Sequence, residues 1–97
     1  MWTTTYEIGK HGTEGGVIIK DEIYKGACRI TLERDCDYSP YVITCGIFGS
    51  FCHTAFCNEE DNEKIYNAMK VELQEFIDTK TSLDEELEFY SRFSEKY

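Results

Sequence analysis

Alternation of apolar and polar side chains over residues 27–33 is the feature that most constrains the fold. Cys28, Ile30 and Leu32 fall on one face of an extended chain. The other face carries the polar residues Arg29, Thr31 and Glu33. This spacing predicts a half-buried antiparallel strand, with its apolar face on a core and its polar face in solvent.

Turn signals divide the rest of the first sixty residues into further strands. Tyr24-Lys25-Gly26 and Phe48-Gly49-Ser50 predict tight turns, and Asp35 to Pro40 predicts a connecting loop. The predicted strands cover residues 3–8, 17–23, 27–33, 41–47 and 51–57, with a glycine-rich loop at 9–16. Hairpin links make these strands an antiparallel β-meander of four to five strands, with both tight turns at one end. The run 41–47 is apolar on both faces and is therefore predicted at the sheet centre.

Two amphipathic helices are predicted after the sheet. Asn58 is the expected N-cap of the first helix, and Ser82 with Glu85 forms the capping-box pattern of the second. The stripe expected to pack the first helix on one sheet face is Ile65, Ala68, Met69, Leu73, Phe76 and Ile77. The apolar side of the second helix is Leu83, Leu87, Phe89, Tyr90 and Phe93. Residues 1–97 are thus expected to form a single α+β domain.

Net charge limits the partners that this chain can bind. The charge is −9, and residues 59–97 carry twelve acids against five bases, so −7 of it lies in the helical half. Nucleic acid and anionic membranes are excluded as expected partners, because binding them depends on Lys and Arg. The same surface favours a basic protein.

Five cysteines offer a second line of interpretation. Without a secretory signal in the sequence, an odd number of cysteines indicates reduced thiols and a cytoplasmic protein. Cys36 lies in a polar loop, where Asp35 and Asp37 are expected to raise its pKa. A strained bridge between Cys45 and Cys52 stays open if these residues face each other across the hairpin, although two packed thiols are favoured.

No pattern of catalytic, cofactor-binding or metal-ligating residues emerges. Cys52, His53 and Cys57 cannot share a zinc ion in an extended strand, because His53 and Cys57 would lie about 13 Å apart and Cys52 would point to the opposite face. His11, in the glycine-rich loop, is interpreted as a solvated side chain. We therefore expect no enzyme activity, no cofactor and no metal.

A non-enzymatic protein-interaction module is the function that these observations favour. A concrete form is an immunity-protein-like or antitoxin-like inhibitor of a basic partner, and self-association into a homo-oligomer is compatible with it. The candidate interaction surface combines aromatic residues at the turns with acidic residues of the second helix: Tyr24, Phe48, Phe51, Glu85, Glu86 and Glu88. The alternative is a cytosolic thiol-dependent or metal-binding small protein that uses Cys45, Cys52, His53 or Cys57.

Overall fold

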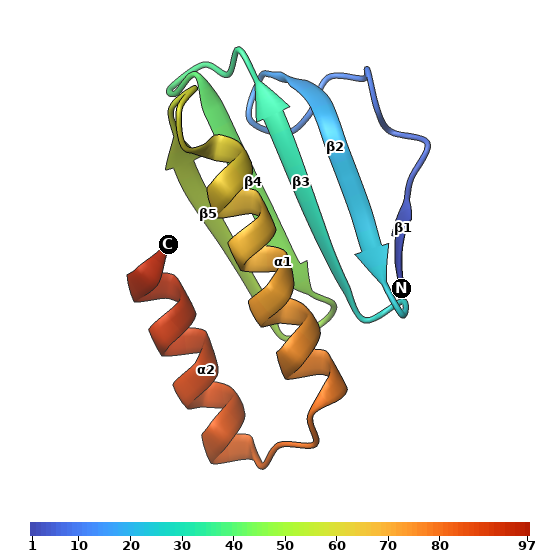
Figure 1. Cartoon of the computed structure of the whole chain (residues 1–97), viewed down its shortest axis with the longest axis vertical. Helices are drawn as coiled ribbons and strands as arrows, with labels where there is room; N and C mark the ends of the chain where they lie inside the picture. The colour runs from blue at the N-terminus through green and yellow to red at the C-terminus, as the bar shows by residue number, and fades with distance from the viewer.

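Five strands form one antiparallel sheet in the computed structural model, which describes all 97 residues. The strands are β1 (Trp2–Thr4), β2 (Val17–Tyr24), β3 (Cys28–Arg34), β4 (Tyr41–Ile47) and β5 (Phe51–Cys57). The strand predicted at 3–8 is shorter, since residues 5–8 belong to the loop that follows β1. Each strand pairs with its neighbours in sequence, in the order β1-β2-β3-β4-β5 (Figure 1). The α+β meander is confirmed. The predicted run 41–47 is β4, an interior strand between β3 and β5, although β3 is the middle strand of the five.

Residues with left-handed backbone close the two tight turns. Lys25 and Gly26 have φ of 52° and 66°, and Gly49 has φ of 78°, a region in which glycine is favoured. The second turn pairs Ile47 with Phe51, so Cys45 faces His53 and Gly46 faces Cys52. The two side chains therefore project from opposite faces of the sheet, so a disulfide between Cys45 and Cys52, which the sequence left open, is wrong. All five cysteines are unpaired.

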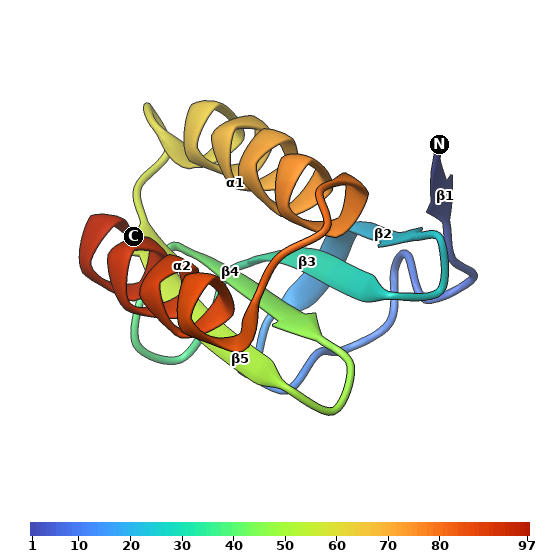
Figure 2. The same cartoon turned by 90° about the horizontal axis from the view of Figure 1, so that it is seen from below.

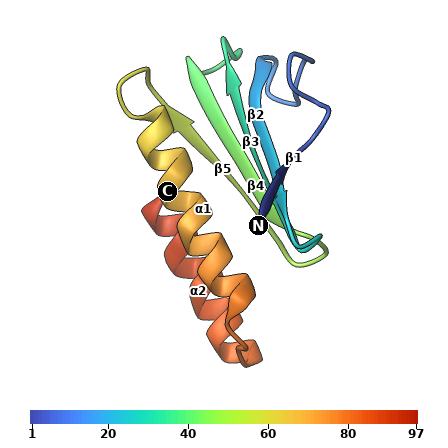
Figure 3. The ribbon, with the colours of Figure 1, turned by 45° about the vertical axis from the view of Figure 1, so that its right-hand side comes forward.

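Both helices, α1 (Asn62–Asp78) and α2 (Leu83–Lys96), lie on the same side of the sheet (Figures 2 and 3). The predicted capping box of α2 is present, with Ser82 accepting from the Glu85 amide. Asn58 is not the N-cap of α1. Its side chain and that of Asp61 exchange hydrogen bonds with each other's backbone amides, and this turn delays the helix start to Asn62.

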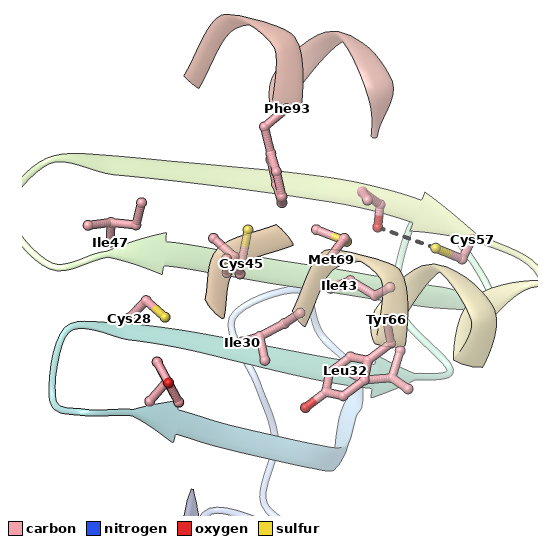
Figure 4. Packing of buried hydrophobic residues seen from close by; sticks show 13 residues of the cluster. Cys28, Ile30, Leu32, Ile43, Cys45, Ile47, Cys57, Tyr66, Met69 and Phe93 are labelled. Carbon is pink, nitrogen blue, oxygen red and sulfur yellow. Dashed lines mark hydrogen bonds between the residues drawn. The ribbon is translucent and has the colours of Figure 1, made fainter. Parts of the chain in front are cut away.

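The core lies between α1, α2 and strands β3 to β5 (Figure 4). Leu73, Met69 and Tyr66 of α1 are fully buried, and Phe93 reaches from α2 towards β5. Tyr66 was absent from the predicted stripe. Its ring is in the core, and its hydroxyl donates a hydrogen bond to Glu22 of β2. This bond lets the polar group of a buried tyrosine find a partner at the edge of the core. Leu83 and Leu87 of α2 remain mostly exposed, contrary to the prediction for that helix.

The sheet face opposite the helices, here called the open face, differs most from the prediction. Thr31 and Glu33 of β3 were expected in solvent but are only 8% and 1% exposed. The segment between β1 and β2 folds back over this face, on the side away from α1 (Figure 2). Hydrogen bonds from the amides of Gly9 to Ile18 and of Ile18 to Lys10 help to hold it there.

Candidate functional site

The six predicted interaction residues do not form one surface. Tyr24 is 3% exposed, with its ring against Trp2 and its hydroxyl donating to Asp78 of α1, so it cannot be part of an accessible patch. Phe51 stacks on Tyr90 of α2 at a centroid distance of 4.7 Å. Both rings close the core, because the helices extend past this end of the sheet. Phe48 alone among the three aromatics is exposed, and it borders the open face.

The acidic residues of α2 lie elsewhere, and two of them line a groove between the helices. This inter-helix groove has a volume of about 300 Å³. Its floor contains Phe76 of α1 and Phe89 of α2, which stack at a centroid distance of 4.3 Å. Its other lining residues are Glu72, Glu75, Thr79, Thr81, Glu85, Glu88 and Arg92. Glu86, by contrast, is half-buried outside the groove.

Four carboxylates and one guanidinium make the groove acidic. Glu72 accepts hydrogen bonds from Lys96 and from the hydroxyl of Tyr97. Glu85 accepts from the Ser82 amide in the capping box, and this bond lowers the pKa of Glu85. Glu75 and Glu88 make no ion pair or side-chain hydrogen bond with the rest of the chain. They are therefore free to meet a positive group brought by a partner.

A second cavity, of about 530 Å³, lies on the open face beneath the loop. Loop residues Glu7, His11, Gly12 and Thr13 form one wall. The sheet and the β4–β5 turn contribute the remaining lining residues: Ile18, Arg29, Thr31, Glu33, Thr44, Cys45, Gly46 and Phe48. Most of these groups are polar, unlike those of the helical side of the sheet.

A buried ion pair lies next to this open-face pocket, which its Arg29 partner lines. Asp21 is fully buried and accepts from Arg29 Nε at 2.8 Å and Nη2 at 2.6 Å. The hydroxyls of Thr5 and Thr31 donate to the same carboxylate at 2.5 and 2.8 Å. Burial acts to raise the pKa of Asp21, but these hydrogen bonds outweigh it and hold the pKa below its ordinary value.

Glu33 fixes the loop onto β3. Its Oε1 accepts from the amides of Glu14 and Gly16, both at 3.2 Å. Gly12 lies so close that a Cβ there would come within 2.2 Å of the Glu33 Cδ. The glycines of this loop therefore permit close approach to a buried carboxylate, a requirement that the sequence pattern alone did not reveal.

Most of the thiols are protected from reaction. Burial raises the pKa of Cys28 and of Cys57 to about 11 and that of Cys45 to about 12. For Cys36 the upward shift predicted from its acidic neighbours is present, but burial is its largest cause, ahead of the charges of Glu33, Glu14 and Asp37. Thiols with raised pKa values are poor nucleophiles at neutral pH.

The structure contains no group of three or more His, Cys, Asp or Glu placed to hold a metal ion. His53 packs edge-on against Phe93 at a centroid distance of 5.8 Å, and its buried Nε2 has no hydrogen-bond partner. Neither helix has the length and apolar character that crossing a bilayer requires. No family model, curated protein or solved structure matches this chain.

Proposed function

We propose that this chain is a cytoplasmic, non-enzymatic interaction module that binds a basic protein through the inter-helix groove. The observation that carries the proposal is the pair of unpaired carboxylates, Glu75 and Glu88, beside the stacked rings of Phe76 and Phe89. A lysine or arginine of the partner would lay its alkyl stem on the rings and its charge against the carboxylates.

Charge elsewhere on the chain supports the same partner class. The net charge of −9 is concentrated in the helical half, and a field of one sign accelerates encounter with a protein of opposite charge. An inhibitor that neutralises a basic protein, in the manner of an immunity protein or antitoxin, is the concrete form that we propose. The five unpaired cysteines support a reducing compartment.

Charge reversal in the groove tests this proposal. The double variant Glu75→Lys with Glu88→Lys changes the net charge from −9 to −5, since each substitution adds two charges. The matched control is Glu59→Lys with Glu60→Lys, which makes the same change at exposed positions before α1. Affinity capture with wild-type protein, followed by mass spectrometry, identifies candidate basic partners, and titration calorimetry then measures each variant against a purified partner.

We expect the groove variant to weaken binding by about tenfold or more, and the control variant by no more than the small loss due to net charge. Binding by the wild type should also weaken as salt is raised. Equal loss in the two variants would show that general acidity, and not the groove, attracts the partner. Absence of any basic partner would remove the proposal altogether.

A further inference from the structure

The open-face pocket plays no part in the function proposed above. We propose that it binds a small organic cation, a molecule with a protonated amine, amidine or guanidine, through the carboxylate of Glu33. The pocket lies across the sheet from the helices, so this site and the inter-helix groove are separate.

Glu33 has bonding capacity that the protein leaves unused. The residue is 1% exposed, and its Oε1 accepts two backbone amides at 3.2 Å, near the upper limit for such bonds. Its Oε2 accepts no hydrogen bond from any group of the chain. This oxygen is not one of the sealed polar atoms without a partner, since His53 Nε2 alone is of that kind, so it is accessible from the pocket that Glu33 lines. A donor brought from outside is therefore favoured at this oxygen.

No cation of the chain supplies that charge. Arg29 is the base among the sheet residues that line the pocket, but its Nε and Nη2 donate to Asp21 and it makes no ion pair with Glu33. Lys10 lies 3.4 Å from Glu7 at the exposed rim, not at Glu33. His11 also lines the pocket, but it is exposed and makes no side-chain hydrogen bond. Two carboxylates, Glu7 and Glu33, line the pocket against one guanidinium, so a cation fits better than an anion.

Size and lining define the ligand further. A volume of about 530 Å³ is within the range of small-molecule sites. The hydroxyls of Thr13 and Thr44 offer hydrogen bonds, and Ile18 and Phe48 offer apolar contact. A flat amidinium or guanidinium can present two parallel N–H groups to a carboxylate, and its body can rest on an aromatic ring.

Three probe molecules of the same shape separate charge from fit. Benzamidine is a cation, benzamide is neutral and benzoate is an anion. Titration into isotopically labelled protein, followed by amide NMR shifts, should place benzamidine at Gly12, Thr13, Thr31 and Thr44. We expect benzamide and benzoate to bind more weakly by about tenfold or more, because benzamide brings no positive charge to the carboxylate and benzoate is repelled by it.

Two variants assign the effect to Glu33. Glu33→Gln keeps an oxygen for the loop amides and removes the charge, so benzamidine affinity should fall by about tenfold or more. Thr44→Phe keeps Glu33 but fills the pocket from β4, and it should abolish binding while thermal unfolding stays cooperative. Glu88→Gln, in the inter-helix groove, should leave benzamidine affinity unchanged.

Several results would overturn the proposal. These are equal binding of benzamidine and benzamide, unchanged affinity in Glu33→Gln, or amide shifts confined to α1 and α2. If Glu33→Gln unfolds, the Thr44→Phe variant decides, since persistent benzamidine binding with the pocket filled places the cation elsewhere. None of these outcomes depends on whether a basic protein binds the groove.

Discussion

Replacement of Asp21 by asparagine should remove one of the strongest polar contacts of the fold. The new side chain has the same shape, and its oxygen can still accept from Thr31 and from Arg29 Nε. Its amide nitrogen, however, would face Arg29 Nη2, a donor that now lies 2.6 Å from Asp21 Oδ2. The side-chain amide of the new asparagine and Arg29 Nη2 are both donors, so the charge-assisted hydrogen bond between residues 21 and 29 at this position is lost.

A hydrogen bond to a charged group contributes about 1.5–3 kcal/mol. The Arg29 side chain is 40% exposed, so water can rehydrate part of the unpaired guanidinium and the cost stays below that of a fully buried pair. We therefore expect Asp21→Asn to lower the free energy of unfolding by about 2–3 kcal/mol. For a domain of this size the melting temperature should fall by about 10–20 °C.

The dependence on pH gives a second measure of the same interaction. The folded pKa of Asp21 lies below its ordinary value of 3.8, so its contribution is complete above that value and is lost as pH falls through the folded pKa. Urea unfolding of wild type and variant should therefore differ by a constant amount from about pH 5 to 7 and converge at lower pH. The control is Glu63→Gln, which breaks the exposed pair with Lys20 at 3.6 Å and should cost about 0–1 kcal/mol.

The reasoning is refuted if Asp21→Asn costs no more than Glu63→Gln. It is also refuted if the difference between Asp21→Asn and wild type persists unchanged below the folded pKa.

Three further predictions concern the loop, the second helix and the thiols. Gly12→Ala should destabilise the protein by about 1–3 kcal/mol in urea unfolding, because the added methyl group meets the Glu33 carboxyl group. The control Thr13→Ala, at an exposed neighbour, should change stability by less than about 0.5 kcal/mol. Similar losses in both variants would contradict this account. Ser82→Ala should remove the capping box at a cost of about 1 kcal/mol and accelerate amide exchange at the start of α2. Ser91→Ala, within the helix, should not accelerate that exchange. Unchanged exchange in Ser82→Ala would argue against the cap. A thiol reagent should modify exposed Cys52 first, half-buried Cys36 more slowly, and Cys28, Cys45 and Cys57 only on unfolding. Cys52→Ser should abolish the fast phase of the reaction. A fast phase that persists in this variant would contradict the assigned exposure of Cys52.

Local patterns predicted the elements of this fold well. The ends of strands 41–47 and 51–57 and the capping box at Ser82 depend on residues within a few positions of each other, so the sequence was sufficient for them. Asn58 was a plausible N-cap by the same logic, but Asp61 offered a competing partner three residues away. The same residues can form either a helix that begins after Asn58 or a turn between Asn58 and Asp61, and the local sequence does not show which is the more stable.

Long-range contacts account for the larger errors. Glu33 and Thr31 have the pattern of a solvated strand face, and their burial depends on a loop that lies about twenty residues earlier in the chain. Tyr66 was missed because its hydroxyl is satisfied by Glu22, which is 44 residues away. The inter-helix groove likewise depends on how α1 and α2 meet. The repeated glycines at 12, 15 and 16 were the available signal for the loop, since they permit close approach to another segment.

The three-residue connection between β4 and β5 also limits how this chain can change in evolution. Because Ile47 pairs with Phe51, odd-numbered residues of β5 face the helices and even-numbered residues face the opposite side. Loss or gain of one residue in this connection, with the rest of the pairing unchanged, would invert β5 and exchange Ala55 and Cys57 in the core for Thr54 and Phe56. Related chains should therefore differ in the length of this turn by even numbers of residues, or carry a compensating bulge in β5.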